Sequence, residues 1–182
     1  MRTGFTLGLL IVFFLVGGTG APAQVHYLVA AGEQNSIREY DENWNYLGDF
    51  VGSVRSPEQM AYGPDGHLYV ASLRAHEVYR FDGVTGEPMG VAGFGTGQRQ
   101  SAWIAFDPDG SLVISWFENG GVTRHDPDTG RFLGNVINPT AAAKPTGHLR
   151  YEVDGEVYRL VSAYSVDKVM RFREDGRRKA TF

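Results

Sequence analysis

The sequence contains no cysteine. This excludes a disulfide-bonded scaffold, a zinc site with thiolate ligands and a cysteine nucleophile. A formal net charge of −4 also leaves the chain without the basic excess that a nucleic-acid-binding domain needs. What the 182 residues do contain is 24 glycines and 13 % aromatic side chains, with few helix-favouring runs. This composition predicts an all-β chain.

The first 23 residues predict a secretory signal peptide. Arg2 provides the positive start, residues 5–16 form an apolar run, and Ala21-Pro22-Ala23 ends a stretch of small residues. The run is shorter than the roughly 20 residues of a membrane span, although an uncleaved N-terminal anchor is the alternative. Cleavage after Ala23 would give a secreted or periplasmic bacterial protein, and no second apolar run follows that would give it a stable membrane span.

The remaining chain, residues 24–182, is built from repeats. Residues 61–66 (AYGPDG) match residues 105–110 (AFDPDG) 44 positions later, and residues 150–155 are a weaker copy 45 positions further on. A second anchor has the same period, because residues 82–86 match residues 126–130. The second anchor predicts a hairpin turn rather than a calcium loop, since residues 126–130 lack the further ligands of an EF-hand.

Each repeat predicts four short strands. In the best copy these are residues 60–62, 67–72, 77–81 and 87–91, with a Pro-Asp-Gly turn between the first two. Four strands in a period of about 44 residues are typical of a β-propeller with four-stranded antiparallel blades. About four blades are present: an incomplete first at 24–56, then 57–98, 99–143 and 144–182.

The faces of adjacent blades must stack to form the core, because one blade cannot bury both of its faces alone. The apolar positions of the second and third repeats therefore predict the core between blades. They are Tyr62, Leu68, Val70, Phe81, Phe106, Leu112 and Ile114.

Two strings carry a family resemblance. Residues 57–71 (PEQMAYGPDGHLYVA), followed by residues 78–82 (VYRFD), resemble the repeats of NHL-type propellers. They are also similar to repeats of gluconolactonase-like and virginiamycin B lyase-like propellers. The resemblance implies the propeller fold. For activity it implies either a metal held by Glu, Asn and Asp from several blades, or His and Glu from adjacent blades.

The repeat count leaves the closure of the ring open. Residues 24–182 span a little under four periods, and NHL-type propellers usually have more blades. The alternatives are a partial propeller, an arc completed by another chain, and a small closed four-bladed ring. An arc would expose apolar blade faces, so self-association through the open blades is expected.

Function is expected on the face formed by two kinds of loop, those joining second to third strands and those joining fourth to first strands. We call this the loop face. Before the first strands, Glu58 and Gln59 share a register with Ala102 and Trp103, and with Gly147 and His148. The candidates for ligand binding on this face are Glu58, Gln59, Arg74, His76, Trp103, Glu118, Asn119, His148 and Asp167.

Two further features belong to the loop face. Arg74, Arg99 and Lys144 would make it locally basic, which suits an anionic sugar or polymer. Glu58, Glu118 and His148 are the candidate ligands for a divalent cation, Ca²⁺, Mg²⁺ or Zn²⁺. The glycine-rich residues 93–97 predict a connector between blades, because they do not precede a helix as a phosphate-binding loop would.

The absence of a convergent catalytic set favours a non-enzymatic binding scaffold. Its ligand would be a protein, a peptide or a carbohydrate held on the loop face. The alternatives are a metal-dependent lactonase or lyase of the exported propeller type, and a propeller fragment with no activity of its own.

Overall fold

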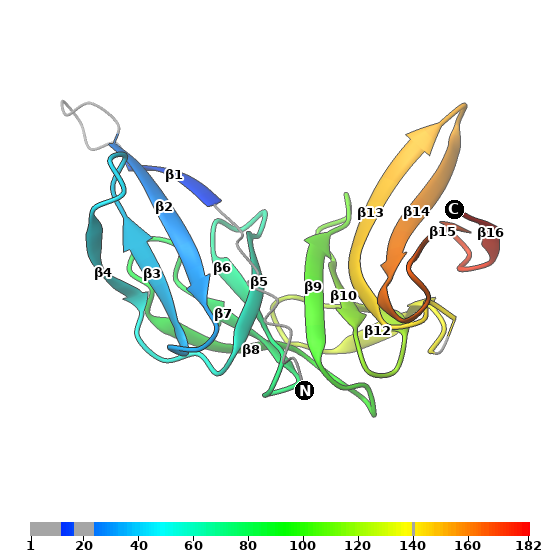
Figure 1. Ribbon diagram of the computed structural model, residues 1–182, viewed down its shortest axis with the longest axis horizontal. Helices are drawn as coiled ribbons and strands as arrows, with labels where there is room; N and C mark the ends of the chain where they lie inside the picture. The colour runs from blue at the N-terminus through cyan, green and yellow to red at the C-terminus, as the bar shows by residue number, and fades with distance from the viewer. Residues whose placement is uncertain (1–11, 17–23, 140) are drawn as a thin grey trace.

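The computed structural model describes residues 12–16, 24–139 and 141–182. They form four antiparallel sheets of four strands, each a simple up-and-down meander. We call these sheets 1 to 4 in chain order (Figure 1). The strands of sheets 1 and 2 are β1 (Val12–Val16), β2 (Gln24–Ala31), β3 (Ser36–Tyr40), β4 (Tyr46–Val51), β5 (Pro57–Tyr62), β6 (Leu68–Ser72), β7 (Glu77–Phe81) and β8 (Pro88–Phe94). Those of sheets 3 and 4 are β9 (Ser101–Phe106), β10 (Leu112–Trp116), β11 (Gly121–His125), β12 (Phe132–Ile137), β13 (Pro145–Val153), β14 (Glu156–Ala163), β15 (Lys168–Arg173) and β16 (Arg178–Thr181).

The four sheets form an open arc. Figure 1 shows sheet 1 and sheet 4 at opposite ends of the molecule, with sheets 2 and 3 between them. The first strands of successive sheets lie side by side, since β5 contacts β9 and β9 contacts β13. The structure is therefore a row of four sheets and not a closed four-sheet ring.

Three apolar layers hold the arc together, one at each junction between sheets. Leu68, Val70 and Phe81 pack against sheet 1, and Leu112 and Ile114 pack against sheet 2. Tyr62 and Phe106 are partly buried at the margins of these layers. The predicted core is therefore confirmed. The middle strands β6 and β10 are buried along their whole length, as expected for strands covered on both faces.

Paired turns repeat with the same geometry in sheets 2 and 3. The carboxylate of Asp82 accepts hydrogen bonds from the backbone N–H groups of Val84 and Thr85. Asp126 does the same for Asp128 and Thr129. Each turn ends in a glycine with positive φ, at residues 86 and 130. The prediction of a hairpin turn at residues 126–130 is confirmed.

Alanine at Gly86 should destabilise the protein more than alanine at Gly66. Its φ is +72°, and a Cβ added there would collide with the backbone oxygen of Phe50 in sheet 1. Gly66 has a similar φ of +79° but open space around it. Gly66→Ala should cost about 1–2 kcal/mol of stability for the left-handed backbone alone. Gly86→Ala should cost about 1–3 kcal/mol more, because of the collision. Urea unfolding of both variants measures this. Equal costs would contradict the close approach of sheets 1 and 2.

The first strand of sheet 1, β1, lies in a segment that the sequence predicted to be signal peptide. β1 pairs with β2 along its whole length, from Val12 opposite Leu28 to Val16 opposite Gln24. It lies inside the predicted signal peptide, whose residues 1–11 and 17–23, including the cleavage site, are outside the described part of the chain. Cleavage after Ala23 would remove β1 and leave three strands in sheet 1. The incomplete first blade therefore remains a prediction for the chain after cleavage.

The register predicted for the fourth repeat is wrong by one residue. His148 pairs with Val161, which corresponds to Met60 opposite Val70 and to Ile104 opposite Ile114. The repeat offset is thus 44 rather than 45, because β13 and β14 form a longer hairpin than their counterparts. A shift of one residue turns a side chain to the other face of a strand. His148 therefore lies in the layer between sheets 3 and 4 instead of on the loop face.

Candidate functional site

A cleft of about 430 Å³ opens on the loop face between sheets 2 and 3. One wall comes from the β6–β7 loop and the start of β7. The other comes from the end of β8 and the connector that leads to β9. Its lining residues are Ala75, His76, Glu77, Phe94, Gly95, Gly97, Gln98 and Arg99.

Hydrogen bonds to the backbone fix the imidazole of His76 in this cleft. Its Nδ1 accepts a hydrogen bond of 3.0 Å from the N–H of Gln100. The neutral ring then carries its proton on Nε2, which becomes a donor. Its own backbone N–H donates to the carbonyl of Ser72, and its φ is +62°. His76 is thus positioned before any ligand arrives.

The connector that carries Arg99 is tied to sheet 3. The N–H of Arg99 donates to Oδ1 of Asn119 at 3.0 Å, and the N–H of Phe117 donates to the carbonyl of Gln100 at 2.8 Å. Below it, the buried Oγ of Ser101 lies 2.8 Å from the carbonyl oxygen of Glu77. These bonds hold both walls of the cleft at a fixed spacing.

The cleft combines groups with different roles in recognition. Phe94 is 45 % exposed and offers an aromatic surface. Arg99, Glu77, His76 and Gln98 offer a cation, an anion, an imidazole donor and an amide. An exposed aromatic ring among such polar groups suits a polar ligand with one apolar face.

The nine predicted site residues are not gathered in one place. His76 lines the cleft, and Asn119 supports it from behind. Arg74, Glu118 and Asp167 are exposed, and Trp103 is half-buried. Gln59 is buried and links two sheets, because its side chain donates to the carbonyl of Met60 and accepts from the N–H of Ile104.

The three candidate metal ligands do not form a cluster. No group of three or more His, Asp and Glu side chains that could hold a metal ion is found in the described part of the chain. Glu58 is half-buried, and burial raises the pKa of its carboxyl. Glu118 is exposed, and His148 lies in the layer between sheets 3 and 4. The structure thus does not bring the three together.

His148 instead forms a buried pair with Ser115. Its Nδ1 lies 2.8 Å from Oγ of Ser115, and both side chains are buried. Burial, together with the nearby charge of Arg159, lowers the pKa of His148 to about 4. The imidazole is therefore neutral at neutral pH, and its role is to fill the layer between the two sheets.

No motif in the sequence marked Glu77, Phe94 and Gln98 as site residues. The signal that was available is Phe94, an aromatic residue in the glycine-rich connector. An aromatic side chain where a strand meets a connector between blades is what could have identified it as part of a site.

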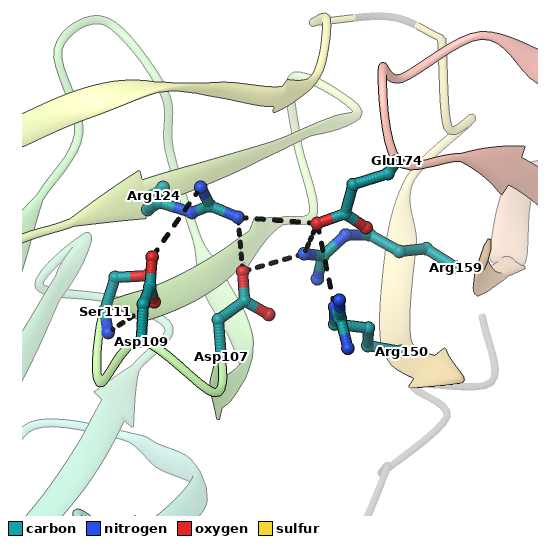
Figure 2. A network of polar contacts seen from close by, with 7 residues as sticks. All are labelled: Asp107, Asp109, Ser111, Arg124, Arg150, Arg159 and Glu174. Carbon is teal, nitrogen blue, oxygen red and sulfur yellow. Dashed lines mark hydrogen bonds and ion pairs between the residues drawn. The ribbon is translucent and has the colours of Figure 1, made fainter. Parts of the chain in front are cut away.

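A large polar network lies at the opposite end of the sheets, between sheets 3 and 4 (Figure 2). Arg159 is fully buried, and its Nη2 lies 2.7 Å from Oδ2 of Asp107 and 3.0 Å from Oε1 of Glu174. Arg124 contacts both carboxylates, and Arg150 lies 3.6 Å from Glu174. Arg159 holds the register of Leu68 and Leu112, so this network replaces an apolar contact and is structural.

Comparison with protein families finds no match for the sequence, and comparison with curated proteins finds none either. Solved structures do resemble the chain. Hydrazine synthase of Kuenenia stuttgartiensis has a TM-score of 0.66 and 16 % identity, over 86 % of this chain and 45 % of its own. A catalytically inactive variant of virginiamycin B lyase from Staphylococcus aureus, solved with quinupristin, has a TM-score of 0.66 and 15 % identity, over 87 % of this chain and 52 % of its own. The chain has a β-propeller fold.

Sheets 1 to 4 are the blades of this propeller. The chain spans about half the length of the two propellers it matches, in keeping with the open arc of Figure 1. Within the residues described, no helix is long and apolar enough to cross a membrane.

Proposed function

We propose that the chain is a non-enzymatic propeller that binds a carbohydrate on its loop face. The observation that carries this proposal is the cleft between sheets 2 and 3, where Phe94 stands exposed among His76, Gln98 and Arg99. Sugars present an apolar C–H face and a rim of hydroxyl groups, so an aromatic ring beside hydrogen-bonding side chains complements them. The predicted export would bring this site to extracellular or envelope glycans.

Arg99 is expected to contribute the strongest single contact, because hydrogen bonds to charged groups contribute about 1.5–3 kcal/mol. Screening the protein on an array of glycans and peptides, then titrating the best ligand by calorimetry, should show that Arg99→Ala weakens binding about 10- to 100-fold. Phe94→Ala should weaken it too. Arg74→Ala is the matched control, since Arg74 is an exposed arginine of the same face outside the cleft lining. Its affinity should stay close to that of the wild type.

Binding that is unchanged in both Arg99→Ala and Phe94→Ala would contradict the cleft as the site. Preference for peptides over glycans would correct the ligand class while keeping the site. An array with no binder at all would overturn the binding function.

The alternative of a metal-dependent lactonase or lyase has the fold similarity to virginiamycin B lyase in its favour. Its test is the metal content of the purified protein, together with lactone hydrolysis. A stoichiometric metal that is lost in Glu58→Ala would replace the binding proposal by this one. A protein without metal, and unaffected by the substitution, would remove the alternative.

A further inference from the structure

The outer face of sheet 4 carries side chains at positions that the other sheets use for packing on their successors. Val169 holds the register of Val78 and Val122, and Leu149 holds that of Ala61 and Ala105. Val78 and Val122 are fully buried against the following sheet, whereas Val169 is 40 % exposed and Leu149 is 59 % exposed. The outer face of sheet 4 thus has the apolar positions of a face that packs on another sheet, but no sheet of the described residues covers it.

The outer face of sheet 1 has the complementary position, the one that packs on a preceding sheet. Tyr27 and Tyr40 hold the register of Leu68 and Phe81. Trp44 stacks on Tyr27 with ring centroids 4.5 Å apart and is itself 51 % exposed. Tyr46 adds a fourth ring beside Tyr40. Trp44 and Tyr46 are 51 % and 54 % exposed, and exposed aromatic rings are typical of a protein–protein contact.

Charge distinguishes the two ends of the arc. Residues 24–56 carry two basic and five acidic side chains, a formal charge of −3, while residues 144–182 carry nine basic and six acidic ones, a formal charge of +3. On the outer face of sheet 4, Arg171 lies over the rings of Tyr158 and Phe182. On the outer face of sheet 1, the carboxylate of Asp49 is 38 % exposed, accepts hydrogen bonds from the hydroxyl groups of Tyr46 and Ser36, and lies 4.0 Å from the guanidinium of Arg38. These opposite charges favour contact between the sheet 1 end of one copy and the sheet 4 end of another, and disfavour contact between like ends.

We propose that two copies of the chain join head to tail, with the outer face of sheet 4 in each copy packed on the outer face of sheet 1 in the other. Head-to-tail contacts produce a ring when the rotation closes. One copy is an arc of four sheets, so two such junctions would close two copies into a ring of eight. The pairing is independent of the ligand proposed for the loop face.

Sedimentation equilibrium of the full chain should give a mass twice the 20.0 kDa of one copy. Leu149→Asp should restore the single-chain mass, because it buries a charge in the junction. Val84→Asp is the matched control, since Val84 is 70 % exposed in the turn after β7, and its mass should stay doubled. Circular dichroism confirms that each variant is folded. A single-chain mass for the wild type, an open series of larger assemblies, or a folded Leu149→Asp variant of doubled mass would each overturn the proposal.

Cross-linking decides the direction of pairing, and the lack of native cysteine makes it clean. Chains with Trp44→Cys and chains with Leu149→Cys are treated with a flexible bis-maleimide, separately and as an equal mixture. Head-to-tail pairing predicts cross-linked dimers in the mixture alone. Dimers formed by either variant on its own would show pairing of like faces and overturn the proposal.

Discussion

Replacing Asp107 by alanine is expected to lower the free energy of unfolding by about 3–5 kcal/mol, the usual cost of removing one partner of a buried ion pair. Asp107 is the carboxylate closest to Arg159, whose side chain is completely buried. Without it, Glu174 is the one carboxylate among the described residues that still pairs with the guanidinium of Arg159, and Glu174 is partly exposed. Urea unfolding at neutral pH measures the loss.

Two variants make this result specific. Asp128→Ala removes an ion pair of 2.8 Å with Arg80 in which the carboxylate is 79 % exposed, so it should cost less than about 1 kcal/mol. Adding Arg159→Leu to Asp107→Ala should recover much of the loss, because leucine occupies that register in sheets 2 and 3. Equal costs for Asp107→Ala and Asp128→Ala would contradict a buried network.

The ion pair of Asp107 with Arg159 also predicts that the folded state loses stability in acid. Burial raises the pKa of Asp107, but the hydrogen bonds and charges of Arg159 and Arg124 outweigh it and bring the pKa below its ordinary value of 3.8. A carboxyl whose pKa is lower in the folded state stabilises the protein above the unfolded pKa and loses this contribution as the pH falls through the folded value. The loss belongs to the region below about pH 4.

The second large effect is the pH dependence created by His148. Its folded pKa is about 4, against an ordinary value of 6.5. Between pH 6.5 and pH 4, His148 is therefore protonated in the unfolded chain but neutral in the folded chain. The free energy of unfolding falls as the pH drops through this range. The difference amounts to about 3 kcal/mol.

The repeat itself supplies the variant that tests this effect. Met60 and Ala71 hold in sheet 2 the positions of His148 and Ser115. The double variant His148→Met and Ser115→Ala should lose about 3 kcal/mol less stability than the wild type between pH 7 and pH 4. Other titrating groups cancel in this comparison. Identical pH profiles would contradict the buried, neutral imidazole.

The sequence predicted the fold because the same turn residues and the same apolar core positions recur in each well-matched repeat. The Pro-Asp-Gly turn and the alternation of Leu68 and Val70 recur 44 residues later, and both copies form the same turn and the same middle strand. The same pattern predicted that Leu112 and Ile114 would be buried, as they are.

The site was less predictable for two physical reasons. First, a hairpin lengthened between β13 and β14 moved the register of the fourth repeat by one residue, which took His148 from the expected loop face into the core. Second, the cleft forms between two sheets, so its walls depend on the distance set by contacts such as Asn119 with Arg99. No pattern within one repeat encodes that distance.

Amide hydrogen exchange with the strongest glycan from the array tests whether ligand is held on the loop face between sheets 2 and 3. Ligand held there should slow exchange in residues 75–77 and 94–99, the two segments that contain the cleft lining. Slower exchange confined to the turns at the opposite end, residues 63–67 and 107–111, would contradict it, and so would exchange that the ligand leaves unchanged everywhere.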